Sequence, residues 1–185
     1  MENVHRILAE LSGESRHITL RRALEEKTRD HLRTVLMNED YSAIEKWYTS
    51  DVTMVVALDA TLDGEVLYGQ EEVIQYFKTI HKQVDIGVVP VLTISDRGRI
   101  TCYAESYYRW MGCGELSVPP FVGWPVVSRG DVLKVREVVV FDLNEEMKVR
   151  RVEWRFMETE SLGQVSIEGS AKESMKLMAL IQGDV

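Results

Sequence analysis

The stretch DYSAIEKWYTSDVTMVVALDATLDGEVLYGQEEVIQYFKTI, residues 40–80, decides the fold. Its first apolar residues recur at helical spacing, and the pattern then changes to the two-residue period of a β-strand in VTMVVAL, residues 52–58. Asp63-Gly64 favours a tight turn into a short return strand, and helical spacing resumes after Gly69. The stretch therefore predicts a short helix, a β-hairpin and a second helix, in that order.

Outside this stretch the chain divides into a helical beginning and a strand-rich remainder. Residues 4–11 predict a short amphipathic helix that ends at Ser12-Gly13, and residues 19–37 predict a longer helix whose apolar stripe includes His31. A last helix is predicted at 171–181. Four later strands are predicted, at 88–95, 99–110, 131–143 and 147–158. A long loop at 112–130 is predicted between the second and the third of them.

Helices that precede most of the strands, and strands joined by turns, predict an α+β fold. Long strands must twist, so the expected architecture is a cone-shaped, strongly curved antiparallel sheet wrapped around the long helix, with extra N- and C-terminal helices. No stretch of linker composition separates two cores. We therefore expect a single domain over residues 1–185, with its core at about 19–160.

Composition narrows the range of partners and cofactors. The net charge is −8 and no block of Lys or Arg forms a phosphate-binding stripe, which argues against nucleic acid and anionic membranes as partners. No apolar run is long enough to span a bilayer, and the N-terminus does not read as a secretory signal, so a cytoplasmic location is expected. Two cysteines without zinc spacing, and no glycine-rich nucleotide motif, predict neither a metal nor a cofactor.

Several segments resemble the nuclear transport factor 2-like superfamily, and within it the SnoaL-like proteins. The resemblance lies in the Asp-led helix, in "YTSDVTMV" and "YGQEEVIQYF" within residues 40–80, and in the closing hairpin VVVFDLNEEMKVRRVEWRF, residues 138–156. It covers about residues 40–158. The resemblance implies a cone with an apolar pocket that binds a small molecule.

The catalytic sets of known members are not carried over. Positions that hold catalytic residues in the ketosteroid isomerases match Val56, Leu32 and Val139 here. Those of the limonene epoxide hydrolases match Ser106, Tyr108 and Trp154. Any activity must therefore depend on other residues.

Strand alternation gives its own set of candidate site residues. On residues 99–110, one face holds small and aromatic groups and is assigned to the cavity, while the other, with Glu105 and Arg109, is assigned outward. On the next strand Glu137 shares a face with apolar neighbours, so desolvation should raise its pKa. Glu137 is the candidate general acid or base, and Tyr108 and His31 are candidate hydrogen-bond donors. The predicted ligand-binding residues are Met54, Val56, Leu58, Ser106, Trp110, Val139, Val152, Trp154 and Trp47.

Each candidate has a structural interpretation as well. Glu137 could lie beside a bulge and pair with Arg151 or Arg109, and Tyr108 could be an ordinary core tyrosine. His31 could be a boundary histidine without a catalytic role.

Two hypotheses follow for function. The first is an isomerase, cyclase or dehydratase that acts on a hydrophobic small molecule, with the apolar segment 118–127 over the mouth of the pocket or against a second subunit. The second is a non-catalytic ligand-binding or oligomerisation module. A homodimer is expected, and in the second hypothesis its contact would be the outward row Tyr103, Glu105, Tyr107 and Arg109.

Overall fold

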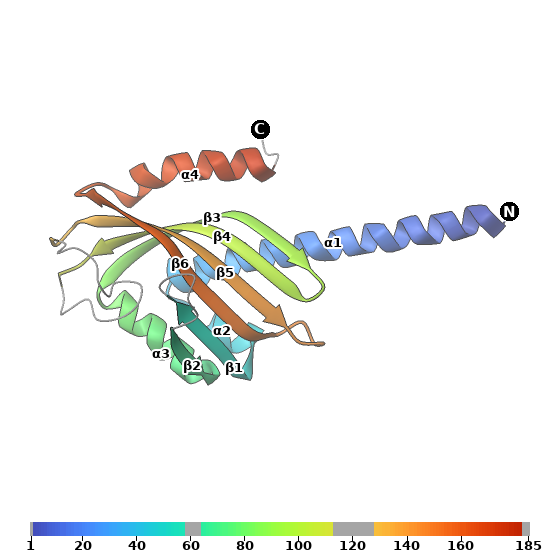
Figure 1. Cartoon of the computed structure of the whole chain (residues 1–185), viewed down its shortest axis with the longest axis horizontal. Helices are drawn as coiled ribbons and strands as arrows, with labels where there is room; N and C mark the ends of the chain where they lie inside the picture. Colours follow the sequence, from blue (N-terminus) through green and yellow to red (C-terminus); the bar gives the residue numbers. More distant parts are fainter. Residues whose placement is uncertain (1, 58–63, 113–127, 183–185) are drawn as a thin grey trace.

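The computed structural model describes residues 2–57, 64–112 and 128–182, with side chains from residue 17 onward. This part of the chain contains four helices and six strands (Figure 1). The helices are α1 (Glu2–Leu36), α2 (Ser42–Trp47), α3 (Gly69–His81) and α4 (Ile167–Gln182). The strands are β1 (Tyr48–Ala57), β2 (Glu65–Tyr68), β3 (Val84–Asp96), β4 (Arg99–Trp110), β5 (Val132–Leu143) and β6 (Val149–Gly163).

The six strands form one sheet in the order β2-β1-β6-β5-β4-β3. Neighbours are antiparallel except for β1 and β6, which run parallel. The predicted α+β architecture is confirmed, and the sheet is mixed where the sequence led us to expect an antiparallel one. The physical reason is that about half of the chain separates β1 from β6, which provides the long connection that a parallel pair needs.

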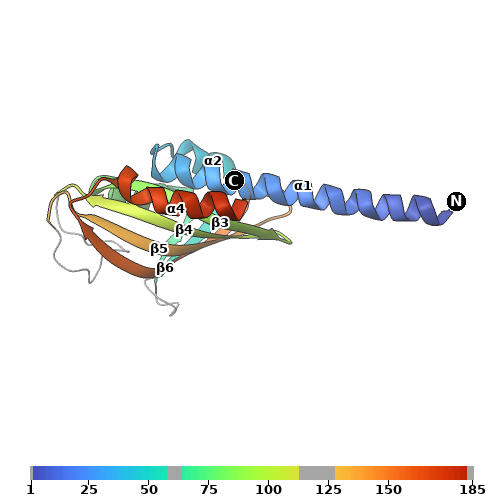
Figure 2. The same ribbon diagram turned by 90° about the horizontal axis from the view of Figure 1, so that it is seen from above.

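Helices cover both faces of the sheet (Figure 2). Residues of α1, α2 and α3 pack with the inward side chains of the strands in the main core, which includes Leu32, Ile44, Phe77, Val139 and Trp154. On the opposite face α4 packs against β3 and β4 in a smaller core that contains Val89, Tyr107 and Ala171. Both faces are therefore buried in this region.

The outward row of β4 departs from prediction because of α4. Tyr103, Glu105, Tyr107 and Arg109 were expected on a solvated or dimer-facing surface, yet Glu105 is only 5% exposed and Tyr107 only 1%. Gly87 of β3 permits this close packing, since a Cβ at that position would collide with Ile167 at the start of α4. The row cannot form the dimer contact as a whole while α4 lies on it.

The first helix is longer than predicted. We expected a break at Ser12-Gly13, but α1 runs without interruption from Glu2 to Leu36. A glycine inside a helix costs about 1 kcal/mol relative to alanine, which is not enough by itself to end a helix. The N-terminal part of α1 reaches well beyond the sheet (Figures 1 and 2). Across the residues that the structure describes, no helix has the length and apolar character needed to cross a membrane.

Candidate functional site

The centre of the candidate site is Glu137 on the inner face of β5. Its side chain is fully buried, at 0% exposure. The β5–β6 pairing shifts register between Arg136 and Glu137, which is the bulge position that the sequence analysis considered. The ion pairs considered there do not form, because Arg151 pairs with Glu153 and Arg109 pairs with Asp85. Within the described residues, Glu137 forms no salt bridge with any Lys, Arg or His.

Three side-chain donors hold the Glu137 carboxylate in place of a cation. Ser106 Oγ donates to Oε1 at 2.6 Å. Trp154 Nε1 and Tyr108 OH donate to Oε2 at 3.0 and 3.3 Å. Ser106 and Tyr108 lie two residues apart on β4, and Trp154 comes from β6, so alternation on three adjacent strands brings the group together.

Burial and these hydrogen bonds act in opposite directions on the Glu137 pKa. Desolvation is the larger effect and raises the pKa from an ordinary 4.5 to about 7, while the hydrogen bonds from Ser106, Trp154 and Tyr108 lower it. Desolvation also raises the pKa of Tyr108 well above its ordinary value, and the charge of Glu137 adds to that rise. At neutral pH Glu137 therefore exists in both protonation states and can either give or accept a proton.

A small hollow lies next to this group. Its volume is about 10 Å³, room for about one water molecule. Glu137 stands behind its wall and is bonded to two of its residues, Tyr108 and Trp154. The described residues that line it are Leu36, Tyr76, Phe77, Ile80, Ile86, Tyr108, Trp154 and Phe156.

The hollow is smaller than the open pocket that the resemblance implies, because aromatic rings fill the inside of the cone. The rings of Phe77 and Trp154 lie 5.6 Å apart between centroids, and those of Tyr76 and Phe77 lie 5.5 Å apart. A ligand larger than water can enter only if some of these side chains move. The aromatic interior is also what gives the hollow its apolar character.

The predicted ligand-binding residues divide into two groups. Trp154 lines the hollow. Ser106 does not line it and is connected to it only by its hydrogen bond to Glu137. Met54, Val56, Trp110, Val139 and Val152 are buried in the main core without lining the hollow, and Leu58 lies outside the described residues.

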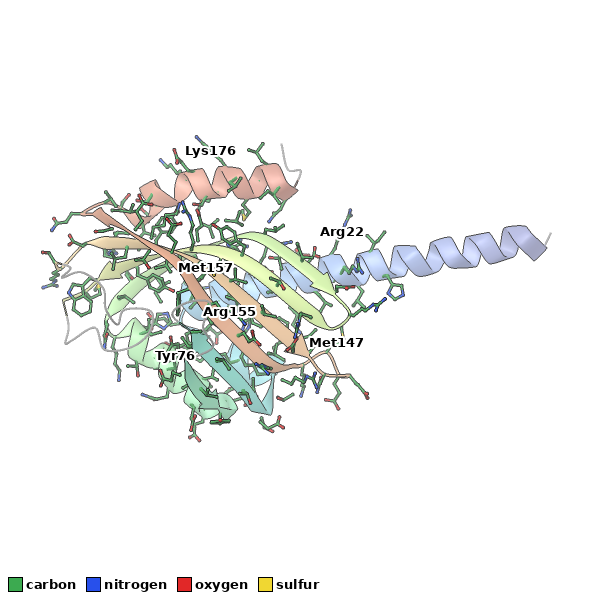
Figure 3. The ribbon with its side chains drawn as sticks, viewed as in Figure 1. Arg22, Tyr76, Met147, Arg155, Met157 and Lys176 are labelled. Atoms are coloured by element: carbon green, nitrogen blue, oxygen red, sulfur yellow. The ribbon has the colours of Figure 1, made fainter. Side chains whose placement is uncertain are left out.

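The sequence analysis missed the contribution of α3. Tyr76, Phe77 and Ile80 form one wall of the hollow, opposite Tyr108 and Trp154. Tyr76, Phe77 and Ile80 are all buried on α3, and the helical spacing after Gly69 is the signal that could have identified them. Figure 3 shows Tyr76 on α3, at the side of the sheet where β2 lies.

His31 and Trp47 line a different recess. It has a volume of about 480 Å³ and lies between α1 and α2. His31 Nε2 lies 3.1 Å from Tyr48 OH, and its ring packs edge-on to Trp47 at 4.9 Å. Burial lowers the His31 pKa to about 3, and the charge of Lys27 acts in the same direction. His31 is therefore a neutral, packed residue at neutral pH, and it has no hydrogen bond to Glu137.

Comparison with solved structures identifies the architecture. No protein-family model matches the sequence, and no curated protein matches it. A SnoaL-like protein from Jannaschia sp. CCS1, described as a polyketide cyclase, is 13% identical and matches 74% of this chain and 87% of its own with a TM-score of 0.53. An epoxide hydrolase of the limonene epoxide hydrolase-like type from Mycobacterium tuberculosis is 10% identical, with coverages of 88% and 98% and a TM-score of 0.52. The chain has the nuclear transport factor 2-like fold.

A third structure with this nuclear transport factor 2-like fold is SalBIII. It is described as an epoxide hydrolase/cyclase-like enzyme of pyran ring formation in the polyether salinomycin. It is 16% identical and matches 71% of this chain and 88% of its own, with a TM-score of 0.51. Identities of this size establish the shared fold, and the chemistry of this chain has to be inferred from its own residues.

The group around Glu137 gives this nuclear transport factor 2-like domain the parts needed for proton transfer. Glu137 has a pKa near neutrality, and Tyr108 lines the hollow while its hydroxyl bonds to Glu137. A proton can thus pass between the hollow and a buried carboxylate through one hydroxyl. No charged side chain lies among the described residues that line the hollow.

Proposed function

We propose that this domain binds an apolar small molecule in the hollow beside Glu137 and acts on it by proton transfer, as a cofactor-independent isomerase, cyclase or dehydratase. The observation that carries the proposal is a fully buried carboxyl group held by three neutral donors. A buried carboxylate without a cation partner is costly, and such perturbed groups are concentrated at functional sites.

Each residue of the group has a distinct role in this proposal. Glu137 takes a proton from the substrate or gives one to it. In the structure the Tyr108 hydroxyl donates a hydrogen bond to Glu137. When Glu137 is protonated, its carboxyl group donates to Tyr108 instead, and the Tyr108 hydroxyl donates to a substrate oxygen on which negative charge develops. Ser106 and Trp154 fix the position of the carboxylate, each through one hydrogen bond.

Two of the solved structures support the reaction class. SalBIII is described as acting in pyran ring formation, and the Jannaschia protein is described as a polyketide cyclase. Both share the fold with this chain. Both descriptions name a cyclisation of an organic molecule, and an aromatic hollow is the kind of site that accommodates an apolar small molecule.

The small size of the hollow supports a second candidate function, a non-catalytic ligand-binding or oligomerisation module. With room for about one water molecule, the interior could act mainly as a packed core. The homodimer and the cytoplasmic location predicted from the sequence belong to the proposal as well. Light scattering tests the homodimer, and a mass equal to one chain at high concentration would contradict it.

Trp154 provides the experiment that separates the two functions. Its indole N–H donates to Glu137, so its ¹H–¹⁵N NMR signal reports on the hollow. We expect apolar ligands found by a thermal-shift screen to move this signal, and we expect turnover of a substrate among them to be lost in Glu137→Gln. Ligands that bind without moving the Trp154 signal, or turnover that survives Glu137→Gln, would contradict the catalytic proposal.

A further inference from the structure

A second recess lies on the outside of the molecule, directly across Tyr76 from the hollow. It has a volume of about 350 Å³ and lies between β2 and α3. Tyr76, labelled on α3 in Figure 3, is 6% exposed and lines both the recess and the hollow. We take it as the partition between them. The described residues of the outer recess are Glu65, Val66, Leu67, Glu72, Gln75, Tyr76 and Thr79.

The charged groups along this path are all acidic. Glu65 and Glu72 line the outer recess, and Glu137 stands behind the wall of the hollow. Tyr76 lines both spaces, and burial together with the charges of Glu65 and Glu137 raises its pKa well above the ordinary value. Among the described residues that line either space there is no Lys, Arg or His. An anionic ligand would thus meet only repulsion along the route.

The walls of the hollow are suited to a cation. Five of its eight described residues are aromatic, namely Tyr76, Phe77, Tyr108, Trp154 and Phe156. Aromatic faces attract organic ammonium groups, and the attraction is stronger where water is excluded. A nearby carboxylate without a cation partner adds a Coulomb attraction that is only weakly screened at this depth.

We propose that this site takes an apolar amine in its ammonium form, which enters through the outer recess past Tyr76 and comes to rest against the aromatic walls in front of Glu137. The inference rests on the proposed binding site beside Glu137 and adds the charge of the ligand and its route. In this proposal the Tyr76 ring rotates to join the recess to the hollow, and the surrounding rings move apart, because the hollow as it stands holds about one water molecule. The recess alone, at about 350 Å³, already lies within the range of small-molecule pockets, roughly 300–1,000 Å³.

Binding of a cation is then linked to the protonation of Glu137. A permanent cation prefers the ionised carboxylate of Glu137, whose pKa is about 7. When the pH is below this pKa, binding of the cation therefore requires Glu137 to lose its proton. Affinity for the cation should be constant above pH 8 and fall about tenfold for each pH unit below 7. A neutral ligand of the same shape has no such dependence.

The test compares choline chloride with its neutral isostere 3,3-dimethylbutan-1-ol, by isothermal titration calorimetry on the full chain. At pH 8 we expect choline to bind at least tenfold tighter than the alcohol. We also expect choline to bind about tenfold more weakly at pH 6 than at pH 8. Glu137→Gln should remove both the preference and the pH dependence. The variant keeps the hydrogen bonds, since its amide oxygen accepts from Trp154 and Tyr108 while its NH₂ donates to Ser106 Oγ.

The route is tested with variants at the recess. Glu65 is exposed and lines it, whereas Glu71 is exposed on α3 and does not, so Glu65→Gln should slow choline association severalfold and Glu71→Gln should leave it unchanged. Tyr76→Ala opens the partition and should speed association, while Phe77→Ala enlarges the hollow alone and should not.

The outcomes separate this inference from the proposed function. Equal affinity for choline and the alcohol, no choline binding at pH 8, or a preference that survives Glu137→Gln would each overturn the ammonium proposal. The proposed function would remain, because its own test, an apolar ligand that moves the Trp154 signal and turnover that is lost in Glu137→Gln, does not depend on a charged ligand. If Tyr76→Ala does not fold, the Glu65 and Glu71 pair still decides the route, and equal rates in that pair would refute it.

Discussion

The substitution Glu137→Gln should change how the stability of the protein depends on pH. In the folded chain burial raises the Glu137 pKa to about 7, against an ordinary 4.5 in the unfolded chain. Between these two values the folded state holds a proton that the unfolded state has lost. The free energy of unfolding must therefore fall as the pH rises through this window. The contribution is fully present below pH 4.5 and is lost above pH 7.

The size of the effect follows from the two pKa values. A rise from 4.5 to about 7 corresponds to about 3 kcal/mol, most of which is lost between pH 5 and pH 8. Glutamine does not titrate, so the variant lacks this contribution. Other titrating groups are shared by both proteins and cancel in the difference. The wild type should thus lose about 2–3 kcal/mol relative to Glu137→Gln between pH 5 and pH 8.

Urea unfolding followed by circular dichroism at pH 5, 6, 7 and 8 measures this difference. Glu145→Gln is the control, because Glu145 is exposed in the turn between β5 and β6, and its difference from the wild type should not change with pH. A difference between wild type and Glu137→Gln that stays constant from pH 5 to pH 8 would refute the reasoning. It would mean that Glu137 is ionised in the folded protein throughout.

Three further predictions concern other buried groups. His31 has a pKa lowered to about 3, so between pH 6 and pH 4 the wild type should lose about 2.5 kcal/mol more stability than His31→Gln in urea titrations, and equal losses would contradict this. Ser174→Ala removes the hydroxyl that donates to Glu105 and bonds to Tyr107 at 2.7 Å, so it should cost about 1–3 kcal/mol and speed hydrogen exchange in α4, whereas Ser170→Ala should do neither. Cys102 is buried with a pKa raised to about 12, so peptide mass spectrometry should find it unmodified after iodoacetamide at pH 8 in the native protein, and rapid labelling would refute this.

The polar centre could be predicted because strand alternation has a strict period of two. Once 99–110 and 131–143 were recognised as strands, Ser106 and Tyr108 had to share a face, and Glu137 had to lie with its apolar neighbours. Only the pairing of the strands was needed to bring them within hydrogen-bonding distance. Trp154 followed in the same way from the last strand.

The size of the hollow and the cover over the outer face could not be predicted in this way. Alternation says that Glu105 and Tyr107 point away from Glu137, but not that α4 returns to bury them, because that contact joins segments about 70 residues apart. The hollow depends on how the rings of Phe77, Trp154 and Tyr76 fill the space, and the sequence pattern does not fix side-chain packing. The sequence pattern placed His31 on the correct apolar stripe of its helix. That stripe faces both the interior of the cone and the recess at α2, so the pattern did not show which of the two His31 lines.

The cost of Glu137 argues that its charge matters. The carboxyl group lowers stability by about 3 kcal/mol at pH 8, a large share of the 5–15 kcal/mol that stabilises a typical domain. Leucine at this position would avoid that cost but would leave the Ser106, Tyr108 and Trp154 donors without their acceptor, at about 1–3 kcal/mol each. Glutamine keeps a hydrogen bond to each of the three residues, accepting from Trp154 and Tyr108 and donating to Ser106 Oγ, without a charge to desolvate. Packing and hydrogen bonding alone therefore do not require glutamate. What only the carboxyl group provides is a proton that can be exchanged near neutral pH and a negative charge for a cationic ligand to balance.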